Sequence, residues 1–269
     1  MPTVELSGVS VCRPAVEGGS REILADVSLD LSDGSLTLFT GGNGSGKSTL
    51  LATIAGLLAF HAGSISIAGS DITKLKRKQL LPLIGILFQN PEKQMFAATV
   101  YDEIAFAARN AGFAPVRLAE AVQGAAVAVD LDISLMDKYP YSLSEGQRRR
   151  VAIASVIVVA PKVLLLDEPT AGLDHLGKMA TIGLVRELVG AGVCVVVATH
   201  EPAEFLDVAR RVFILESGTV REEDLEIVRR RFVPWLRLYH ALLERGVALP
   251  VGITDQRELV AALGERMSR

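Results

Sequence analysis

Cysteine and long apolar runs are both scarce in this sequence of 269 residues. The two cysteines, Cys12 and Cys194, stand far apart, which suggests neither a disulfide framework nor a zinc site and fits a reducing cytoplasm. The longest apolar stretch, residues 151–160, ends at Pro161 and is roughly half of the ~20 residues that a membrane-spanning helix needs. We therefore expect no membrane-spanning helix. The first residues also lack the basic and apolar segments of a signal peptide.

An excess of one charge is also missing. The chain has 28 basic and 31 acidic residues, which gives a formal charge of -3, and its basic patches are short. A dedicated nucleic-acid binder usually carries a basic face, so we expect no nucleic-acid partner. Hydrophobic residues make up 49% of the chain, enough for the core of a globular protein of one or two domains.

The alternation of apolar and polar residues predicts a mainly parallel sheet with an antiparallel flank. Residues 4–10 and 27–31 alternate, which is typical of antiparallel strands with one solvated face. Residues 163–166 and 193–198 are continuous apolar runs, typical of central parallel strands that helices cover on both faces. Further patterns predict strands at 36–40, 64–68 and 83–88 and a helix at 47–58.

Two other segments are predicted to be helical. Residues 100–136 are rich in alanine with helical spacing, which indicates a helical subdomain inserted at about 91–160. Beyond Gly218 the pattern changes: Pro234 suits the first turn of a helix, and a second short helix is expected from Asp255 with Glu258 completing a capping box. The first of these helices carries one apolar stripe of Trp235, Leu238, Tyr239 and Leu242. The expected fold class is α/β, a sheet wrapped by helices.

A glycine-rich loop between an expected strand and an expected helix is typical of a phosphate-binding loop. Small residues let backbone N–H groups wrap phosphates at the start of a helix, and the flanking elements argue against a plain turn. Lys47 adds a positive charge at the β- and γ-phosphates, and the Ser48 hydroxyl can ligate Mg²⁺. We therefore expect ATP and Mg²⁺ as cofactors and a P-loop (RecA-like) sheet. The loop comprises Gly41, Gly42, Asn43, Gly44, Ser45, Gly46, Lys47, Ser48 and Thr49.

Two carboxylates stand at the end of the apolar run 163–166. Asp167 is expected to hold Mg²⁺, directly or through water, and Glu168 to orient the attacking water or accept its proton. On their own these acids fit equally well as caps of the following turn, where Pro169 ends the strand. The loop at Lys47 favours the catalytic interpretation.

In their order along the chain, these motifs and four others resemble the ABC ATPase family over nearly all of residues 4–220. Gln89 resembles the family's Q-loop glutamine, which contacts metal and water and senses the transport partner. His200 resembles its switch histidine, which lies at the γ-phosphate. The resemblance implies Glu168, His200 and Gln89 as catalytic residues, Ser48, Gln89 and Asp167 as metal ligands, a nucleotide-binding domain at 1–220 and a helical extension at 221–269.

The remaining two motifs imply a shared active site. Residues 143–147 are similar to the family signature, and residues 171–174 resemble its D-loop. At a helix N-terminus, Ser144 and the N–H groups around Gly146 form an anion site. In the family that site serves ATP on the opposite subunit, so Ser144, Gly146, Gln147 and Asp174 are implied as nucleotide-binding residues. The implied partner is a second ABC ATPase subunit, identical or paralogous.

Two positions depart from the family pattern. The signature has Glu145 where the family usually has glycine, and this carboxylate either repels an incoming phosphate or points away. Arg13 stands where the family usually supplies an aromatic ring to stack on adenine. A flat guanidinium can stack in the same place, although an exposed arginine at a strand end is the ordinary alternative.

Within the family, residues 88–106 and 235–263 resemble the ATPases of energy-coupling-factor (ECF) importers, which take up vitamins or transition-metal ions. That resemblance implies an integral membrane partner and a peripheral position on the cytoplasmic face of the membrane. Glu92, Asp102 and Glu103 are candidates to dock arginines of that partner, and Asp102 and Glu103 equally suit a helix start. The alternatives are another ABC transporter ATPase or a soluble ABC switch acting on nucleic acid or ribosomes.

Overall fold

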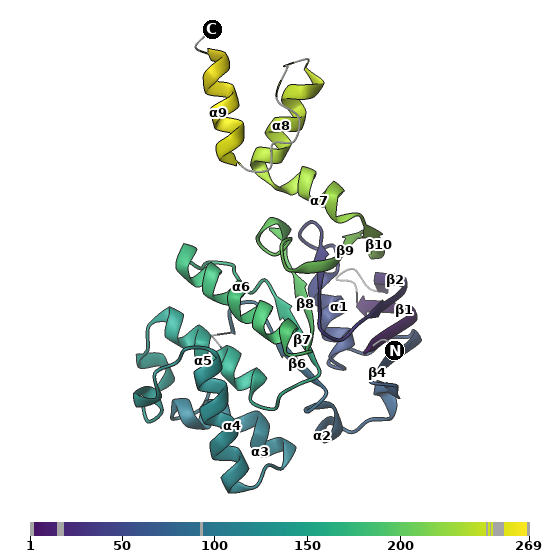
Figure 1. Cartoon of the computed structure of the whole chain (residues 1–269). Coiled ribbons are helices and arrows are strands. Elements are labelled where there is room, and N and C mark those ends of the chain that lie inside the picture. The colour runs from purple at the N-terminus through teal and green to yellow at the C-terminus, as the bar shows by residue number, and fades with distance from the viewer. Residues whose placement is uncertain are drawn as a thin grey trace.

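Two sheets and a set of helices make up the part of the chain that the computed structural model describes, residues 3–14, 19–91, 94–245, 247, 249 and 256–267 (Figure 1). The strands are β1 (Val4–Pro14), β2 (Ser20–Leu31), β3 (Ser35–Thr40), β4 (Ala62–Ile67), β5 (Ser70–Asp71), β6 (Ile84–Leu87), β7 (Val163–Asp167), β8 (Cys194–Ala198), β9 (Ala209–Glu216) and β10 (Thr219–Glu223). The α-helices are α1 (Lys47–Ile54), α2 (Arg77–Leu80), α3 (Val100–Ala111), α4 (Pro115–Ala128), α5 (Glu145–Ile157), α6 (His175–Gly190), α7 (Leu225–Phe232), α8 (Pro234–Glu244) and α9 (Gln256–Met267).

The larger sheet confirms the predicted α/β class. Its strand order is β10-β9-β3-β8-β7-β6, and all its neighbours are parallel except the β9–β10 hairpin. A separate sheet of order β2-β1-β4-β5 is antiparallel throughout and forms the predicted flank. The flank strands β1 and β2 are longer than their alternation indicated.

The core occupies both faces of the larger sheet. Along β7, Val163 and Leu165 pack toward α1 and the antiparallel sheet, whereas Leu164 and Leu166 pack toward α3, α5 and α6. Both faces of the strand are therefore buried, which is why its sequence is a continuous apolar run. This arrangement holds the ends of β3 and β7 in place, and those ends carry the predicted site.

The inserted helices form a layer of their own beside the larger sheet (Figure 1). Helix α3 begins at Thr99, whose hydroxyl accepts a hydrogen bond from the N–H of Asp102, and ends at Gly112 with a left-handed φ of 86°. Its residues Ile104, Ala105 and Ala108 are buried, as the periodicity predicted. Within the described residues, no helix is both long enough and apolar enough to cross a membrane.

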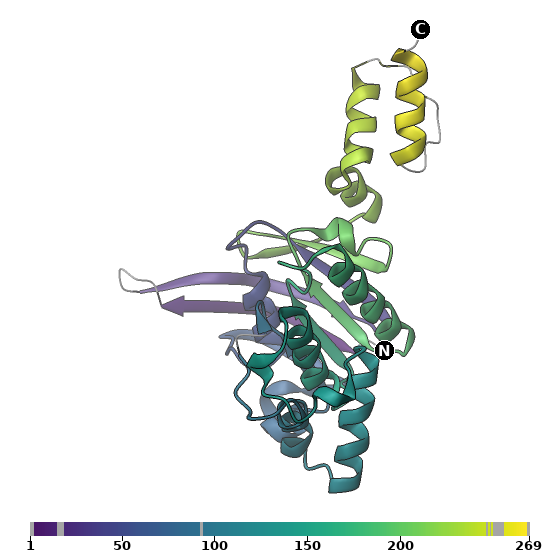
Figure 2. The ribbon, with the colours of Figure 1, turned by 90° about the vertical axis from the view of Figure 1, so that its left-hand side faces the viewer.

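Helices α8 and α9 stand away from the main body (Figure 2), whereas α7 packs on it through the buried Val228. Tyr239 and Leu259 form a small core in which Trp235 and Leu242 are partly buried. Leu238 keeps 50% of its surface exposed, so the apolar stripe expected on α8 does not pack as a whole. The expected helix start at Asp255 lies outside the described residues. The larger sheet includes β10, so it extends past residue 220, the expected domain boundary.

Candidate nucleotide-binding site

The glycine-rich loop joins β3 to the N-terminus of α1 in a conformation that requires glycine. Gly41 has a φ of 155°, and a Cβ atom there would lie 2.3 Å from the Leu215 carbonyl oxygen. Gly46 is the N-cap of α1 with a left-handed φ of 107°, and no side chain caps the helix. The first N–H groups of α1 therefore remain available to an anion.

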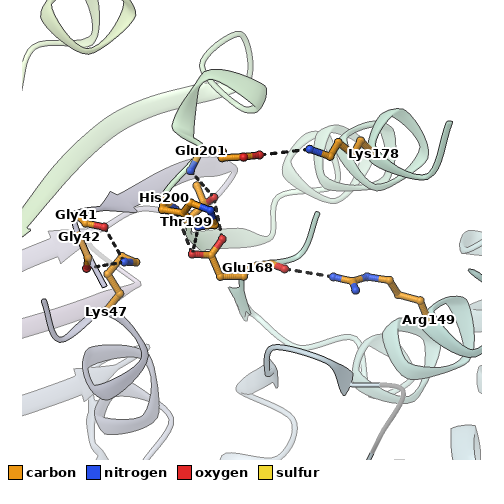
Figure 3. Close-up of polar contacts among 9 residues, drawn as sticks. All are labelled: Gly41, Gly42, Lys47, Arg149, Glu168, Lys178, Thr199, His200 and Glu201. Carbon is orange, nitrogen blue, oxygen red and sulfur yellow. Dashed lines mark hydrogen bonds and ion pairs between the residues drawn. The ribbon is translucent and has the colours of Figure 1, made fainter. Parts of the chain in front are cut away.

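The interior of the loop is suited to phosphate groups. Lys47 is buried, and its Nζ donates to the carbonyls of Gly41 at 2.8 Å and Gly42 at 3.2 Å (Figure 3). Ser45 Oγ is buried and has no hydrogen-bond partner among the described residues. A Cβ atom built on Gly42 or Gly44 would meet nothing within 4 Å, so the loop is open where these residues face outward. A buried lysine, an unpartnered hydroxyl and uncapped N–H groups all fit a polyphosphate ligand.

A cavity of about 710 Å³ brings most of the predicted site residues together. They come from elements far apart in the sequence, because the carboxyl ends of parallel strands meet at one edge of the sheet. The lining residues are Arg13, Arg21, Ile23, Asn43, Gly44, Ser45, Gly46, Lys47, Ser48, Thr49, Gln89, Asp167, Glu168 and His200. Arg21 and Ile23 were not predicted, because they reach the cavity only through the pairing of β2 with β1.

Asp167 and Ser48 lie together at the end of β7. Burial raises the pKa of Asp167, the Ser48 hydroxyl opposes that rise by hydrogen bonding to the carboxylate, and the charges of Glu168 and Lys47 act in opposite directions. A bound cation would favour the ionised form further. The donor set of carboxylate, hydroxyl and the nearby Gln89 amide is an oxygen set, the kind that Mg²⁺ prefers.

The carboxylate of Glu168 is held by the two residues that follow β8, Thr199 and His200. Its Oε2 accepts from Thr199 Oγ1 at 3.1 Å, and its Oε1 accepts from the His200 N–H at 3.1 Å and lies 2.8 Å from His200 Nδ1 (Figure 3). The backbone of Glu168 is left-handed, with a φ of 49°, although it is not glycine. Such strain is common at functional sites. Thr199 was not singled out from the sequence, and its position directly before His200 was the available signal.

The signature and D-loop residues do not reach this cavity within one chain. Ser144 is the N-cap of α5 and forms a capping box with Gln147, and Asp174 is the N-cap of α6 and accepts from the Gly177 N–H. Gly146 and Asp174 line a different cavity of about 530 Å³ between α5 and α6. Within a single chain Ser144, Gln147 and Asp174 therefore have helix-capping roles, and none of the signature and D-loop residues lines the cavity of Lys47.

Arg149 links the signature helix to the turn that carries Glu168. It is buried on α5, and its guanidinium donates to the Glu168 carbonyl at 3.2 Å (Figure 3). It also donates to the carbonyls of Pro169 and, at 3.4 Å, Ala171. The sequence placed it only within a short basic patch. These hydrogen bonds pair the positive charge of the Arg149 guanidinium with the carbonyl dipoles of the turn.

The acids proposed for docking have other partners in this structure. Glu103 is buried, and its Oε2 accepts from the Phe96 N–H at 3.0 Å and the Ala97 N–H at 2.8 Å. Asp102 pairs with Arg109 at 2.8 Å and accepts from Thr99. These contacts favour the helix-start interpretation over docking, and Glu92 lies outside the described residues.

An apolar groove of about 340 Å³ adjoins the Q-loop segment and α3. Phe96 and Phe106 line it with an edge-to-face contact of 4.7 Å between ring centroids. They remain 64% and 46% exposed, respectively. Two adjacent exposed aromatic rings beside a groove indicate an interaction surface.

Comparison with known proteins identifies the family. The family model for the ABC transporter matches residues 24–171. An energy-coupling factor transporter ATP-binding protein EcfA2 from Symbiobacterium thermophilum is 35% identical over 89% of this chain and 88% of its own length. The solved structure of cbiO1 from Clostridium perfringens, described as part of the ABC transporter complex cbiONQ, is 31% identical, covers 90% of this chain and 95% of its own, and has a TM-score of 0.74.

A dimeric ATP-binding cassette solved in a post-hydrolysis state with ADP and Pi is also similar, with 26% identity, a TM-score of 0.73 and coverage of 82% of this chain and 98% of its own. The chain spans most of the length of each of these relatives. Together with the phosphate loop and the acids at the end of β7, these matches show that the chain belongs to the ABC transporter ATP-binding family and is an ATPase coupled to transport.

Proposed function

We propose that this chain is the ATPase subunit of an ECF-type importer for vitamins or transition-metal ions, peripheral on the cytoplasmic face of the membrane. The observation that carries the catalytic part is one cavity that joins Lys47, Asp167, Glu168 and His200. The ECF assignment is supported by the similarity to the energy-coupling factor transporter ATP-binding protein EcfA2 from Symbiobacterium thermophilum.

In this proposal the phosphate loop binds the triphosphate of ATP. Lys47 gives up its carbonyl partners in the loop and pairs with the β- and γ-phosphates. Ser48, Asp167 and Gln89 would hold Mg²⁺, which supplies positive charge that stabilises the negative charge developing on the phosphates. The raised pKa of the buried Asp167 fits a carboxylate awaiting a cation.

Glu168 would orient the attacking water and accept its proton. Thr199 and the His200 N–H fix its carboxylate, so the base is held in place before the nucleotide arrives. Because Nδ1 of His200 already faces the Glu168 carboxylate, Nε2 is the ring atom left to face the γ-phosphate. It would donate to a phosphate oxygen only when the imidazole carries a proton on both nitrogens.

A second ATPase subunit would complete the site. The N-terminus of α5 carries Ser144 and Gly146 but has no phosphate within reach in its own chain. Leu176 and Met179 on α6, close in sequence to Asp174, are large apolar side chains left exposed. A partner that places its Lys47 loop against Ser144 would use both features, and a similar cassette has been solved as a dimer.

The membrane subunit would dock at the groove of Phe96 and Phe106. The Q-loop segment forms one wall of this groove, and Gln89 on that segment also lines the nucleotide cavity. A partner seated there is therefore one short segment away from the phosphates. In this proposal the membrane subunit binds the apolar groove, and the acids of α3 do not have the docking role that was expected of them.

Copurification in mild detergent tests this function. We expect an integral membrane protein to accompany the chain and a Phe96→Ser/Phe106→Ser double variant to lose it while its ATP affinity is retained. Val116 on α4 is 74% exposed, so Val116→Ser is the matched control and should keep the partner. Recovery of ribosomes or nucleic acid in place of a membrane protein would contradict the proposal.

A further inference from the structure

Two arginines face each other at the outer end of the nucleotide cavity. Arg13 on β1 and Arg21 on β2 are direct partners in the antiparallel ladder, and both line the cavity. Like charges placed directly opposite each other destabilise a strand pair. Neither guanidinium has a hydrogen bond or ion pair with any residue that the structure describes. Among the described residues, no acid or acceptor offsets the repulsion between the two guanidinium groups.

The two arginines lie where the base of a bound nucleotide belongs. A Cβ atom on Gly46 would lie 3.3 Å from the Ile23 carbonyl oxygen, so β2 touches the phosphate loop at Ile23. Arg21 follows two residues further out on the same face of the strand, about 7 Å away. Going outward along the cavity, the order is therefore the phosphate loop, Ile23 and the arginine pair. This matches the order of the phosphates, the ribose and the base in a nucleotide. Figure 2 shows the β1–β2 hairpin extending outward from the main sheet.

A guanidinium only donates hydrogen bonds, and this decides which base the pair can read. The edge of guanine offers two adjacent acceptors, O6 and N7, which suit a bidentate arginine. Adenine offers N7 but places the N6 amino donor beside it, which conflicts with a second guanidinium donor. Ile23, the third residue at this end of the cavity, has no acceptor in its side chain.

We infer that Arg13 and Arg21 form a base site that accepts guanine at least as well as adenine, so that this ATPase also binds and hydrolyses GTP. Arg13 stacks on the purine, and Arg21 donates to its O6 and N7 edge. The inference rests on the proposed nucleotide site. It adds a substrate class to that site and two residues that determine its base selectivity.

Calorimetric titration of the full chain with ATP, GTP and inorganic tripolyphosphate tests the inference. The wild type should bind GTP at least as tightly as ATP. The Arg13→Ala/Arg21→Ala variant should lower the GTP-to-ATP affinity ratio by roughly 5- to 100-fold, the discrimination of one good bidentate contact. Arg13→Tyr keeps a stacking surface and leaves the Arg21 donors in place, so it should keep the wild-type GTP-to-ATP affinity ratio, whereas Arg21→Ala alone should lower it.

Tripolyphosphate lacks a base and separates base contacts from phosphate contacts. Its affinity should be unchanged in the arginine variants and in Arg237→Ala, an exposed arginine on α8, and should be lost in Lys47→Ala. A tenfold or greater preference of the wild type for ATP, or an equal loss of all three ligands in the arginine variants, overturns the inference. A wild-type chain that binds none of the three overturns the proposed nucleotide site itself.

Discussion

At the scale of one residue, the backbone conformation of Glu168 determines where its carboxylate points. A left-handed backbone costs a residue other than glycine about 1 kcal/mol or more, and here the turn is held by the Ala198 carbonyl and by Arg149. That conformation turns the carboxylate toward Thr199 and His200 instead of along the strand. The strain is thus maintained where a positioned base is needed.

Replacing Glu168 with Gln should separate binding from hydrolysis. The amide keeps the size of the side chain and can still accept from Thr199, but it cannot take a proton. We expect ATP affinity near that of the wild type and a turnover reduced by ~10²- to 10⁴-fold, the usual contribution of a general base. Phosphate release measured beside nucleotide binding checks this. Near-normal turnover would remove Glu168 from the mechanism.

The two cysteines should differ sharply in reactivity. Burial raises the pKa of the Cys194 thiol to about 12, whereas Cys12 is exposed on β1. The thiolate is the reactive species, so Cys194 should be inert at pH 8 while Cys12 reacts. A thiol reagent should modify Cys12 alone in the native chain and both thiols in denaturant, and Cys12→Ser should abolish native labelling. Rapid native labelling of Cys12→Ser would contradict the burial of β8.

At the scale of secondary structure, α3 connects the inserted helices to the Q-loop segment. Its first turn contains two neighbouring acids with different tasks, since Glu103 is buried against backbone N–H groups while Asp102 is paired at the surface. Loss of a buried acceptor leaves its donors unsatisfied, whereas an exposed ion pair contributes little. The helix is therefore anchored by one acid only.

We expect Glu103→Ala to lower the free energy of unfolding by about 1–3 kcal/mol, because two partly buried N–H groups lose their buried acceptor. Asp102→Asn should have a much smaller effect. Its hydrogen bonds from Arg109 and Thr99 hold the pKa of Asp102 below the ordinary value of 3.8. The ionised form stabilises the fold above that pH, so the difference between wild type and Asp102→Asn should vanish as the pH falls through the lowered pKa. Urea unfolding from pH 3 to pH 7 measures the free energy of unfolding of both variants. An equal loss of stability in the two variants would contradict these roles.

Strands and helices with strong periodicity could be predicted from the sequence, whereas contacts that depend on pairing could not. The runs at β7 and β8 and the loop before α1 were identified because each is determined by local chemistry. Strand β9 has only the short apolar run 212–215, which does not distinguish a buried strand from a helix. Arg21 faces the site through register with Arg13, and the buried state of Glu103 depends on how a loop folds over it. Such long-range contacts leave no local signal.

At the scale of the whole molecule, the residues of the proposed shared site lie in two separate places. Lys47 and Glu168 lie in one cavity, and Ser144 lies outside it at the start of α5. This separation supports the proposal of a site shared between two subunits.

Mixing Lys47→Ala chains with Ser144→Ala chains should recover activity that neither has alone. In a mixed dimer one composite site contains both defects and the other contains neither. Ser144→Ala also removes a helix cap, which costs about 1 kcal/mol, so Ser144→Asn serves as the variant that keeps a cap. ATPase assays on confirmed mixed dimers check this. If they are as inactive as Lys47→Ala alone, sites shared in trans are excluded.

Arg149 gives the two sites of such a dimer a means of cooperating. Because it binds the Glu168 turn from α5, a shift of that helix is transmitted to the catalytic carboxylate of the same chain. The N-terminus of the same helix carries Ser144, which would contact the nucleotide of the partner. Occupancy of one site would therefore change the geometry of the other, and hydrolysis should rise sigmoidally with ATP concentration.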